Sequence, residues 1–550
     1  MEFDAMSPTS TAYSPTTPTP HEEPKYHRPS SVLLRMRRSR RCTALLIFVA
    51  LVAVVVAGQL LLMLHAHRDR LWARPSRRCA DLPVPPDHWH LADGSPAFVS
   101  IPNAAPIGVG GSVCVRVVVP PRPHNATVLY TPFPGTPWDS VLLDMVGNAT
   151  NISVPVDLRP IRHVMNTERS SVHIYEADVV LRDADVYIPQ GILEYRDAEW
   201  NPEMRELLVP YAPANLTIDD GLAVEAVEAA DGGENPYSLS RHMELPLCTE
   251  SSPEGRWVSI DDLPFDPSWV PLPDNNGRVW LPYACRLKRY SYERFAHCLR
   301  ERYPVLHLFG DSNIRRMMKK LTTLGQWCST PEQQATKACF CEDHEEKFDR
   351  FNVDARDIFF DIDARAGGWM QTRSFDLTRA PQDKARIYMR RWDGLTRSRA
   401  PWSEPFEKNI TTFGRPQMAI VALTNWDAAF SPRAFYAQEL ERLLDFIESG
   451  FGVDTEIVVR TGQYYCCRHD ESRTQRMYTR LRTKAFDQYI RDVFNDRFNG
   501  TRRISVWDVA AISERRPLEA RMESIPCHSN HARSEVIEVE NQVLFNYMCN

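Results

Sequence analysis

The pattern of apolar and polar positions divides the chain into stretches of different character. Residues 44–64 read ALLIFVALVAVVVAGQLLLML and contain no charge. As a helix this stretch is about 31 Å long, which matches the hydrocarbon thickness of a bilayer. Within 96–222, short runs rich in β-branched and aromatic residues lie between Pro, Asn, Gly and Asp, at 112–119, 126–133, 171–181 and 206–211. These runs predict a β-sandwich of immunoglobulin-like size.

After residue 301 the pattern changes to strands that alternate with helices. Apolar runs that predict strands lie at 304–310, 417–423, 455–462 and 504–512. The helix after the second of these runs is expected to begin at Ser431 and to end at Gly450. Alternation of this kind predicts a parallel sheet covered by helices on both faces, with its site beyond the carboxyl ends of the strands.

The remaining stretches have little regular pattern. Residues 1–43 contain a Ser/Thr/Pro tract that predicts a disordered cytoplasmic tail, and 65–95 are expected to form a stem. Residues 223–300 are rich in Pro, Trp and Cys, so we expect disulfides and buried indoles to hold this connection. The α/β domain is expected to cover 301–550.

Composition and charge narrow the class of protein. Hydrophobic residues make up 43% of the chain and charged residues 25%, as in proteins with packed cores. The formal net charge of −6 argues against nucleic acid as a partner, because nucleic-acid-binding domains are usually basic.

The apolar segment is expected to span a membrane, and three patterns, in the basic residues, the cysteines and the glycosylation sequons, indicate its orientation. It is longer than the apolar part of a signal peptide and begins over forty residues into the chain, which favours a single membrane span over a cleaved leader. Seven basic residues precede it and five lie directly after it, within residues 65–78, and twelve of the thirteen cysteines follow it. All N-x-Ser/Thr sequons also follow it, at Asn125, Asn148, Asn151, Asn215, Asn409 and Asn499. We therefore expect a type II membrane protein of the secretory pathway, with the Golgi as its natural location.

A candidate nucleophile lies where the first strand of the α/β domain meets its helix. Gly310-Asp311-Ser312-Asn313 places Ser312 at a helix amino terminus, where free backbone N–H groups and the helix dipole favour an anion. Attack of this serine on an ester creates an oxyanion at that position. The alternative is that Ser312 only caps the helix.

A serine nucleophile needs a base, and the candidate is His531. It closes the segment Cys527-His528-Ser529-Asn530-His531, directly before the last predicted helix. The alternative is a structural histidine.

These features resemble a known fold. A strand, Gly-Asp-Ser and a helix, with an Asn after a middle strand and a His before the last helix, resemble the SGNH hydrolase fold. Over residues 248–550 the chain is more closely similar to the PC-esterase group, which includes the NXPE proteins and the trichome-birefringence-like acetyltransferases. The residues that carry this likeness are Cys248, Gly255, Trp257, Trp280, Cys285, Cys298-Leu299, and Gly310-Asp311-Ser312 with Arg315.

The resemblance implies a role for each matching residue. Ser312 corresponds to the nucleophile and His531 to the base. Asn425, in Leu-Thr-Asn-Trp-Asp, corresponds to the side-chain donor to the oxyanion, and Gly368 or its neighbour Gly367 to a backbone donor.

One departure from the family pattern concerns the acid that orients the base. The family has an Asp three residues before the His, whereas this chain has His528. Loss of such a carboxylate can cost about 10⁴ in rate. Asp508 is then the candidate orienting acid, with Glu523 as a further choice, unless a Ser–His pair suffices or activity is lost. Arg315 and His528 are candidates for binding an anionic group of the substrate.

The resemblance implies a lumenal serine O-acyltransferase or esterase that acts on O-acetyl groups of glycans. It implies no bound cofactor, an acetyl donor such as acetyl-CoA as co-substrate, and a glycan or glycoprotein as acceptor. His528 and the sandwich motivate an alternative, an inactive ectodomain of the same fold that binds glycans or proteins. A glycosyltransferase would need a D-x-D motif, a form found in Asp361-Ile362-Asp363.

Two cysteine clusters also contain metal-ligand types. Cys339 and Cys341 lie near His344, and Cys466-Cys467 near His469. An even number of cysteines in an oxidising lumen favours disulfides over zinc, so no metal is expected.

Overall fold

The computed structural model divides the chain into two units, residues 1–73 and 74–550. The predicted tail and the predicted membrane helix at 44–64 lie outside the residues that the structure describes. Within the described ranges, no helix is long and apolar enough to cross a membrane. Those ranges are 78–82, 96–102, 104–120, 139–165, 171–195, 214–219, 221–228, 235–323, 325–334, 339, 357–363, 368–372, 384–391, 394–396, 414–431, 433–464, 479–518, 521 and 531–550.

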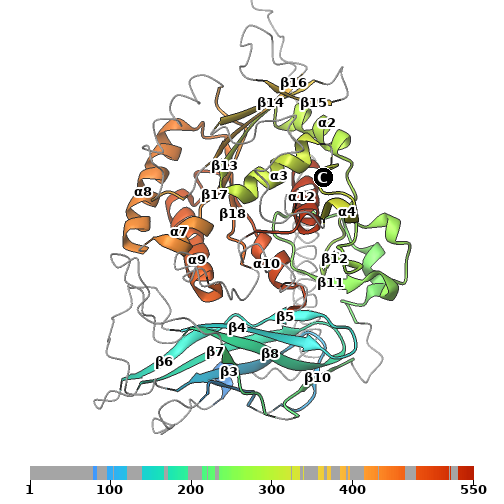
Figure 1. The fold of residues 1–550 in the computed structure, drawn as a ribbon, viewed down its shortest axis with the longest axis vertical. Helices are drawn as coiled ribbons and strands as arrows, with labels where there is room; N and C mark the ends of the chain where they lie inside the picture. Colours follow the sequence, from blue (N-terminus) through green and yellow to red (C-terminus); the bar gives the residue numbers. More distant parts are fainter. Residues whose placement is uncertain are drawn as a thin grey trace, which may run out of the picture. The chain divides into compact units, whose positions relative to one another are not determined.

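Two β-sheets fold from the region between residues 98 and 227 (Figure 1). The first is antiparallel, in the order β1 (Phe98–Ser100), β3 (Gly111–Val119), β7 (Ser171–Leu181) and β6 (Arg159–Met165). The second has the order β2 (Ile107–Gly108), β10 (Val224–Val227), β8 (Asp185–Tyr195), β4 (Ser140–Gly147) and β5 (Ser153–Pro155), with β9 (Ala214–Asn215) paired to β8. All pairs in the second sheet are antiparallel except β2 with β10.

Side chains of both sheets share one hydrophobic core. Val113 and Val115 of β3 and Leu143 and Met145 of β4 alternate toward this core and are fully buried. The region is therefore a pair of packed sheets. The predicted strands at 112–119 and 171–181 are confirmed as β3 and β7, whereas those at 126–133 and 206–211 lie outside the described residues.

The connection after the sheets has more regular structure than its sequence suggested. β11 (Gly255–Ser259) and β12 (Arg278–Pro282) pair antiparallel, with Trp257 opposite Trp280. Both indoles are buried and a disulfide joins Cys248 to Cys285, so the expectation that indoles and disulfides hold this region is confirmed. Its other elements are η2 (Leu239–Glu244), η3 (Ile260–Asp262), η4 (Pro267–Trp269) and α2 (Tyr292–Arg302).

A seven-stranded sheet organises the rest of the chain, and it confirms the expected mixed α/β class. Its order is β15 (Gly368–Thr372), β14 (Asp357–Asp363), β16 (Lys384–Arg391), β13 (Val305–Gly310), β17 (Met418–Ala422), β18 (Glu456–Arg460) and β19 (Ile504–Trp507). The five strands from β16 to β19 in this order are parallel, as predicted. β14 and β15 add an antiparallel edge, because the four residues 364–367 between them are too few for a crossover.

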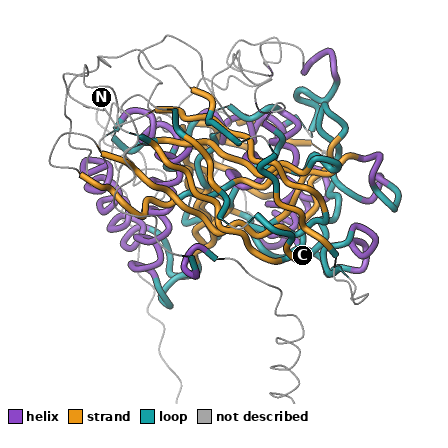
Figure 2. Tube along the Cα trace, turned by 90° about the horizontal axis from the view of Figure 1, so that it is seen from below, coloured by secondary structure: helices purple, strands orange, loops and turns teal. Residues whose placement is uncertain are grey.

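Helices cover both faces of this sheet (Figures 1 and 2). On one face lie α2, α3 (Ser312–Thr322), α10 (Val509–Glu514) and α12 (Ser534–Cys549). On the other lie α7 (Asn425–Phe430), α8 (Arg433–Gly450) and α9 (Arg480–Phe498). Leu306 and Leu308 of β13 pack on the first face and Phe309 on the second, following the period of a strand. The predicted strand at 504–512 is shorter than expected, because α10 begins at Val509.

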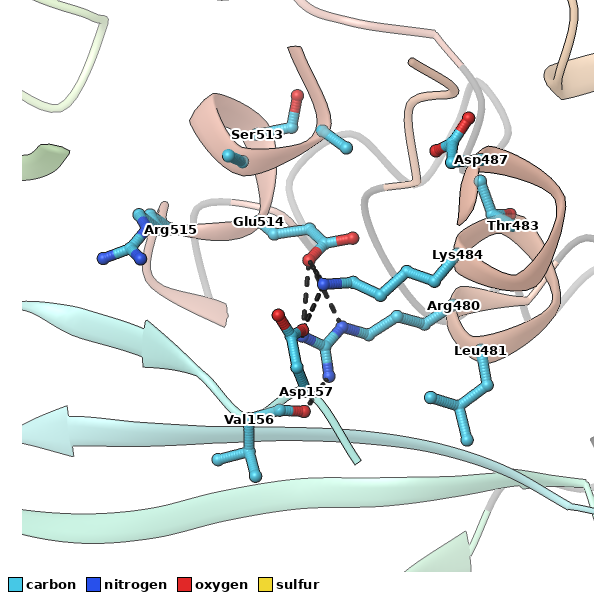
Figure 3. Close-up of polar contacts among 12 residues, drawn as sticks. Val156, Asp157, Arg480, Leu481, Thr483, Lys484, Asp487, Ser513, Glu514 and Arg515 are labelled. Atoms are coloured by element: carbon cyan, nitrogen blue, oxygen red, sulfur yellow. Dashed lines mark hydrogen bonds and ion pairs between the residues drawn. The ribbon is translucent and has the colours of Figure 1, made fainter. Parts of the chain in front are cut away.

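An ionic network joins the segment after β5 to α9 and α10 (Figure 3); Arg480 and Glu514 are buried in it, whereas the Asp157 side chain is exposed. The fully buried Arg480 donates to the Val156 carbonyl oxygen at 2.7 Å and to a carboxylate oxygen of Asp157 at 3.1 Å. Its guanidinium also lies 3.3 Å from Glu514, and the Lys484 ammonium lies 3.0 Å from the same carboxylate. Removal of one partner from such a network is costly, because it leaves a buried charge uncompensated.

Glu194 of β8 makes a second buried contact between the two-sheet unit and the α/β unit. Its carboxylate accepts from the Ser140 hydroxyl at 2.7 Å, from the Arg480 backbone N–H at 3.0 Å, and from the Tyr464 hydroxyl. Burial raises the pKa of Glu194 to about 7, although these donors favour the ionised form.

Candidate active site

The hydroxyl of Ser312 and the ring of His531 meet at the carboxyl edge of the sheet. Ser312 Oγ and His531 Nε2 are 2.7 Å apart, although 219 positions separate the two residues along the chain. Ser312 is the first residue of α3, and His531 lies three residues before α12. The two side chains that the sequence analysis paired are therefore in hydrogen-bond contact.

Local geometry explains why Ser312 occupies a tight turn. Asp311 is the N-cap of α3, and its carboxylate accepts from the Asn313 backbone N–H at 2.9 Å. A Cβ atom at Gly310 would lie 2.5 Å from Ile314 Cγ1 and 2.9 Å from Ala422 Cβ, so a glycine is required there. The N–H of Ser312 then lies at the amino terminus of α3, where the helix dipole favours an anion.

The segment that follows His531 is anchored to the protein interior. Ala532 is fully buried, and the Ser534 hydroxyl donates to the carbonyl oxygen of Cys328 at 3.0 Å. Cys328 is itself bonded to Cys339 in a disulfide, so Cys339 is a structural half-cystine rather than a metal ligand. These contacts hold the start of α12 beside α3.

Asn425 begins α7 directly after β17, the neighbour of β13 in the sheet. Its side chain is 6% exposed, and its Oδ1 atom accepts from the backbone N–H of Gln463 at 2.9 Å. This bond identifies the oxygen end of the amide, and the NH₂ end is a hydrogen-bond donor. β13 and β17 are parallel, and Ser312 and Asn425 therefore follow neighbouring strands at the same edge.

The turn after β18 supports Asn425, and sequence analysis did not find it. The Gly462 backbone N–H donates to the two carboxylate oxygens of Asp487 at 3.0 and 3.2 Å, and the Thr424 hydroxyl donates to the same group. Burial raises the pKa of Asp487 to about 7 against these donors, and the nearby Asp508 adds to the rise. The only sequence signal was a glycine after a strand.

The structure contradicts the expectation that Gly368 is an oxyanion donor. Gly368 pairs with Asp363, which pairs with Lys384 at the start of β16. The carboxyl edge is at the other end of that strand, where Arg391 lies opposite Gly310. Gly368 therefore lies on an outer strand at the wrong edge of the sheet. Its neighbour Gly367 lies outside the described residues.

Asp508 does not orient His531, which corrects a second expectation. It is the N-cap of α10, and its carboxylate accepts from the Ala511 N–H and the Thr461 hydroxyl, both at 3.1 Å. Its other oxygen pairs with Arg491 at 2.8 Å. Among the described residues these groups are the partners of the carboxylate. The other candidates around the base, His528 and Glu523, lie outside the described residues.

Arg315 lies one turn into α3 and is 3% exposed, close to the 7% of Ser312. The expectation that it binds an anionic group of the substrate stays a prediction.

The sequons and cysteines of the sequence are described in part. Asn148, Asn151, Asn215 and Asn499 are exposed, whereas Asn125 and Asn409 lie outside the described residues. Among the residues that the structure describes, four disulfides are present, which confirms the expected disulfide chemistry: Cys79–Cys114, Cys248–Cys285, Cys298–Cys549 and Cys328–Cys339.

Comparison with known sequences gives no match, either to a protein-family model or to a curated protein. The function must therefore be inferred from the arrangement of Ser312, His531 and Asn425.

Proposed function

We propose that the protein is a membrane-anchored, lumenal serine O-acyltransferase or esterase that acts on O-acyl, chiefly O-acetyl, groups of glycans. The observation that carries this proposal is the 2.7 Å contact between Ser312 Oγ and His531 Nε2 at a helix amino terminus. A serine, a base within hydrogen-bond reach and a set of N–H donors are the parts that acyl transfer needs. In this proposal the α/β unit is of the SGNH hydrolase type and the two sheets are immunoglobulin-like.

The mechanism uses a covalent acyl-serine. His531 removes the hydroxyl proton of Ser312 as its oxygen attacks the carbonyl carbon of the acyl donor. The tetrahedral oxyanion accepts hydrogen bonds from the Ser312 N–H and from the Asn425 NH₂ group. The intermediate then breaks its bond to the leaving group of the donor, which takes the proton from His531.

The second half returns the enzyme to its starting state. The hydroxyl of a glycan acceptor, or a water molecule in the esterase reaction, attacks the acyl-serine, and His531 takes its proton. The acyl–Ser312 bond breaks and the serine oxygen recovers that proton. Neither half requires a bound cofactor, because the acyl donor is a co-substrate such as acetyl-CoA.

Two further observations support the compartment and the acceptor in this proposal. The four described sequon asparagines are exposed, as glycosylation requires. Eight cysteines are paired in disulfides, as an oxidising lumen favours. The glycan acceptor follows from the resemblance to the PC-esterase group. The Golgi follows from the type II orientation expected for residues 44–64.

The test uses the full-length protein in detergent. A fluorophosphonate probe should label the wild type at Ser312, and Ser312→Ala should abolish both labelling and transfer of acetyl groups to glycan. Ser449→Ala removes an exposed serine on α8 and should change neither. His531→Gln should slow labelling by about 10³-fold or more, because the serine loses its base.

Equal labelling of the wild type and Ser312→Ala would overturn the assignment of the nucleophile. Absence of labelling together with retained glycan binding would instead favour the inactive binding ectodomain.

A further inference from the structure

A pocket on the surface of the connection region lies apart from Ser312. Its volume is about 490 Å³, within the range of small-ligand sites, about 300–1,000 Å³. The residues that line it are Met243, Ser268, Trp269, Arg286, Lys288 and Arg289.

Trp269 is the exception among the indoles of this region. Trp257 and Trp280 are buried, whereas 56% of Trp269 is exposed, and the nearby Leu272 is 49% exposed. An exposed indole presents a flat apolar face that suits stacking against the C–H face of a sugar ring. Because the indole of Trp269 is largely exposed, it contributes little to the packed core of this region.

The charged residues that line the pocket are all basic. Arg286, Lys288 and Arg289 line it, and none of the described residues forms an ion pair with them. Burial lowers the pKa of Lys288, and the positive charges of Arg294 and Arg286 lower it further. The carboxylate of Asp266 accepts from the Ser268 N–H at 2.8 Å as a helix cap, which lowers its pKa and keeps it ionised. The lining itself therefore has three cations and no acidic side chain.

The walls of the pocket are fixed. Arg286 Nε donates to the Leu245 carbonyl oxygen at 3.1 Å, next to the Cys248–Cys285 disulfide. The backbone of Lys288 exchanges two hydrogen bonds of 2.8 Å with the side-chain amide of Asn546 on α12. Prearranged groups bind with a smaller loss of conformational entropy.

We propose that this pocket binds an acidic saccharide, in which the sugar ring stacks on Trp269 and a carboxylate or sulfate lies between Lys288 and Arg289. The lone indole beside several cations argues against an apolar protein partner. An acidic saccharide matches this lining, because its ring faces can stack on Trp269 and its acidic groups can pair with the basic side chains.

The position of the pocket gives it a role separate from the chemistry. Asn546, which bonds the backbone of the lining residue Lys288, is twelve residues along α12 from Ser534, about 18 Å as a helix, and His531 precedes that helix start. A single sugar cannot span this distance, whereas a chain can. The pocket therefore anchors an acidic glycan chain whose other part reaches Ser312. This role rests on the proposed function, but the binding does not.

The test measures binding of the full-length protein to oligogalacturonate and to heparin-derived oligosaccharides by calorimetry. Fully methyl-esterified oligogalacturonate is the control, because it keeps the rings and loses the charges. We expect binding to at least one acidic probe, no measurable binding to the methyl ester, and weaker binding as salt rises. Equal affinity for the acid and its ester, or no binding to either acidic probe, would overturn the proposal.

Variants identify the site. Trp269→Ala should weaken binding about tenfold, with part of the affinity kept in Trp269→Phe. Arg289→Ala should weaken it about two- to fivefold, whereas Arg442→Ala, which removes an exposed arginine of α8, should have no effect. Binding to phosphatidylserine vesicles that is lost in Trp269→Ala, without saccharide binding, would identify a membrane site and contradict the proposal.

Labelling of Ser312 separates this inference from the proposed function. Trp269→Ala should leave fluorophosphonate labelling at the wild-type rate, because the pocket is remote from Ser312. Saccharide binding without labelling of the wild type would remove the proposed function alone. Labelling without saccharide binding would remove this inference alone.

Discussion

The backbone N–H of Gln463 donates to the side-chain oxygen of Asn425 at 2.9 Å. Gln463, in the turn after β18, therefore orients the side chain of Asn425, which lies after β17. Gly462, the residue before Gln463, is held by the buried carboxylate of Asp487. Through these contacts α9 supports a side chain that we propose to stabilise the oxyanion, although α9 itself has no proposed contact with substrate.

Asn425→Asp tests the donor role of the amide. Aspartate keeps an oxygen that accepts from the Gln463 N–H but has no NH₂ group to donate. We expect a loss of about 10²–10³ in kcat, as for removal of one oxyanion donor elsewhere. The melting temperature should change little in comparison. Acetyl transfer at the wild-type rate in Asn425→Asp would show that this amide does not contact the oxyanion.

Gly462→Ala tests the close approach of the supporting turn. A Cβ atom there would lie 2.6 Å from Thr424 Cγ2 and 2.9 Å from Asn425 Oδ1, so the Asn425 amide must move. We expect a fall in kcat of about tenfold or more with KM nearly unchanged, because the displaced amide acts in the transition state. Gly452→Ala is the matched control, since its nearest new contacts are 3.7 and 3.9 Å. An equal effect of both substitutions on kcat would contradict the assignment.

Part of this arrangement was predictable from the sequence. A nucleophile at a strand–helix junction is a local feature, and the parallel sheet that brings Ser312 and Asn425 to one edge follows from alternating strands and helices. Gln463 and Asp487 were not predictable, because they act through a backbone N–H and through burial, which leave no local pattern. Gly368 was misplaced because sequence spacing does not reveal that the preceding strand, β14, runs antiparallel and brings the start of β15 to the amino edge of the sheet.

The two-sheet unit shows the same limit. β4 and β8 form its most extensive pairing in the second sheet, but neither was predicted. Pro189 and Gly191 lie in the interior of β8, although these residue types usually mark turns rather than strand interiors. Tertiary pairing with β4 overrides this local preference.

The variant Glu194→Gln tests the buried contact between the two-sheet unit and the α/β unit, through the pH dependence of the free energy of unfolding. Burial raises the pKa of Glu194 from 4.5 to about 7 in the folded protein. Between these values the folded state keeps the proton while the unfolded state releases it, so the free energy of unfolding falls as pH rises. One group contributes at most about 1.4 kcal/mol per pH unit to this slope. Glutamine does not titrate, and thermal unfolding of this variant from pH 5 to 8 should show a flatter decline.

The comparison with wild type isolates this one group. Asp427, Asp487 and Glu540 also have pKa values raised by burial, to about 6, 7 and 7, so the wild-type slope is their joint effect. Glu448→Gln removes an exposed carboxylate on α8 and should leave the slope unchanged. A slope that is the same in Glu194→Gln and wild type would show that Glu194 is ionised in the folded protein.

The disulfide between Cys298 and Cys549 should stabilise the fold without affecting the site. It joins α2 to the carboxyl end of α12, across 251 positions of sequence. The double variant Cys298→Ala with Cys549→Ala should lose about 2–5 kcal/mol of unfolding free energy. Labelling of Ser312 below the melting temperature should remain, because His531 lies at the opposite end of α12. An unchanged melting temperature would contradict this prediction.

Helix α9 contacts both the two-sheet unit and the turn that follows β18. Near its start Arg480 and Lys484 contact the two-sheet unit and Glu514, and two turns later Asp487 holds the Gly462 turn. A shortened chain that began after the two sheets would expose Arg480 to solvent on the side where Val156 and Glu194 now cover it. For expression and crystallisation, therefore, the sheets and the α/β unit belong in one polypeptide, and an α/β fragment trimmed at residue 230 is expected to be poorly soluble.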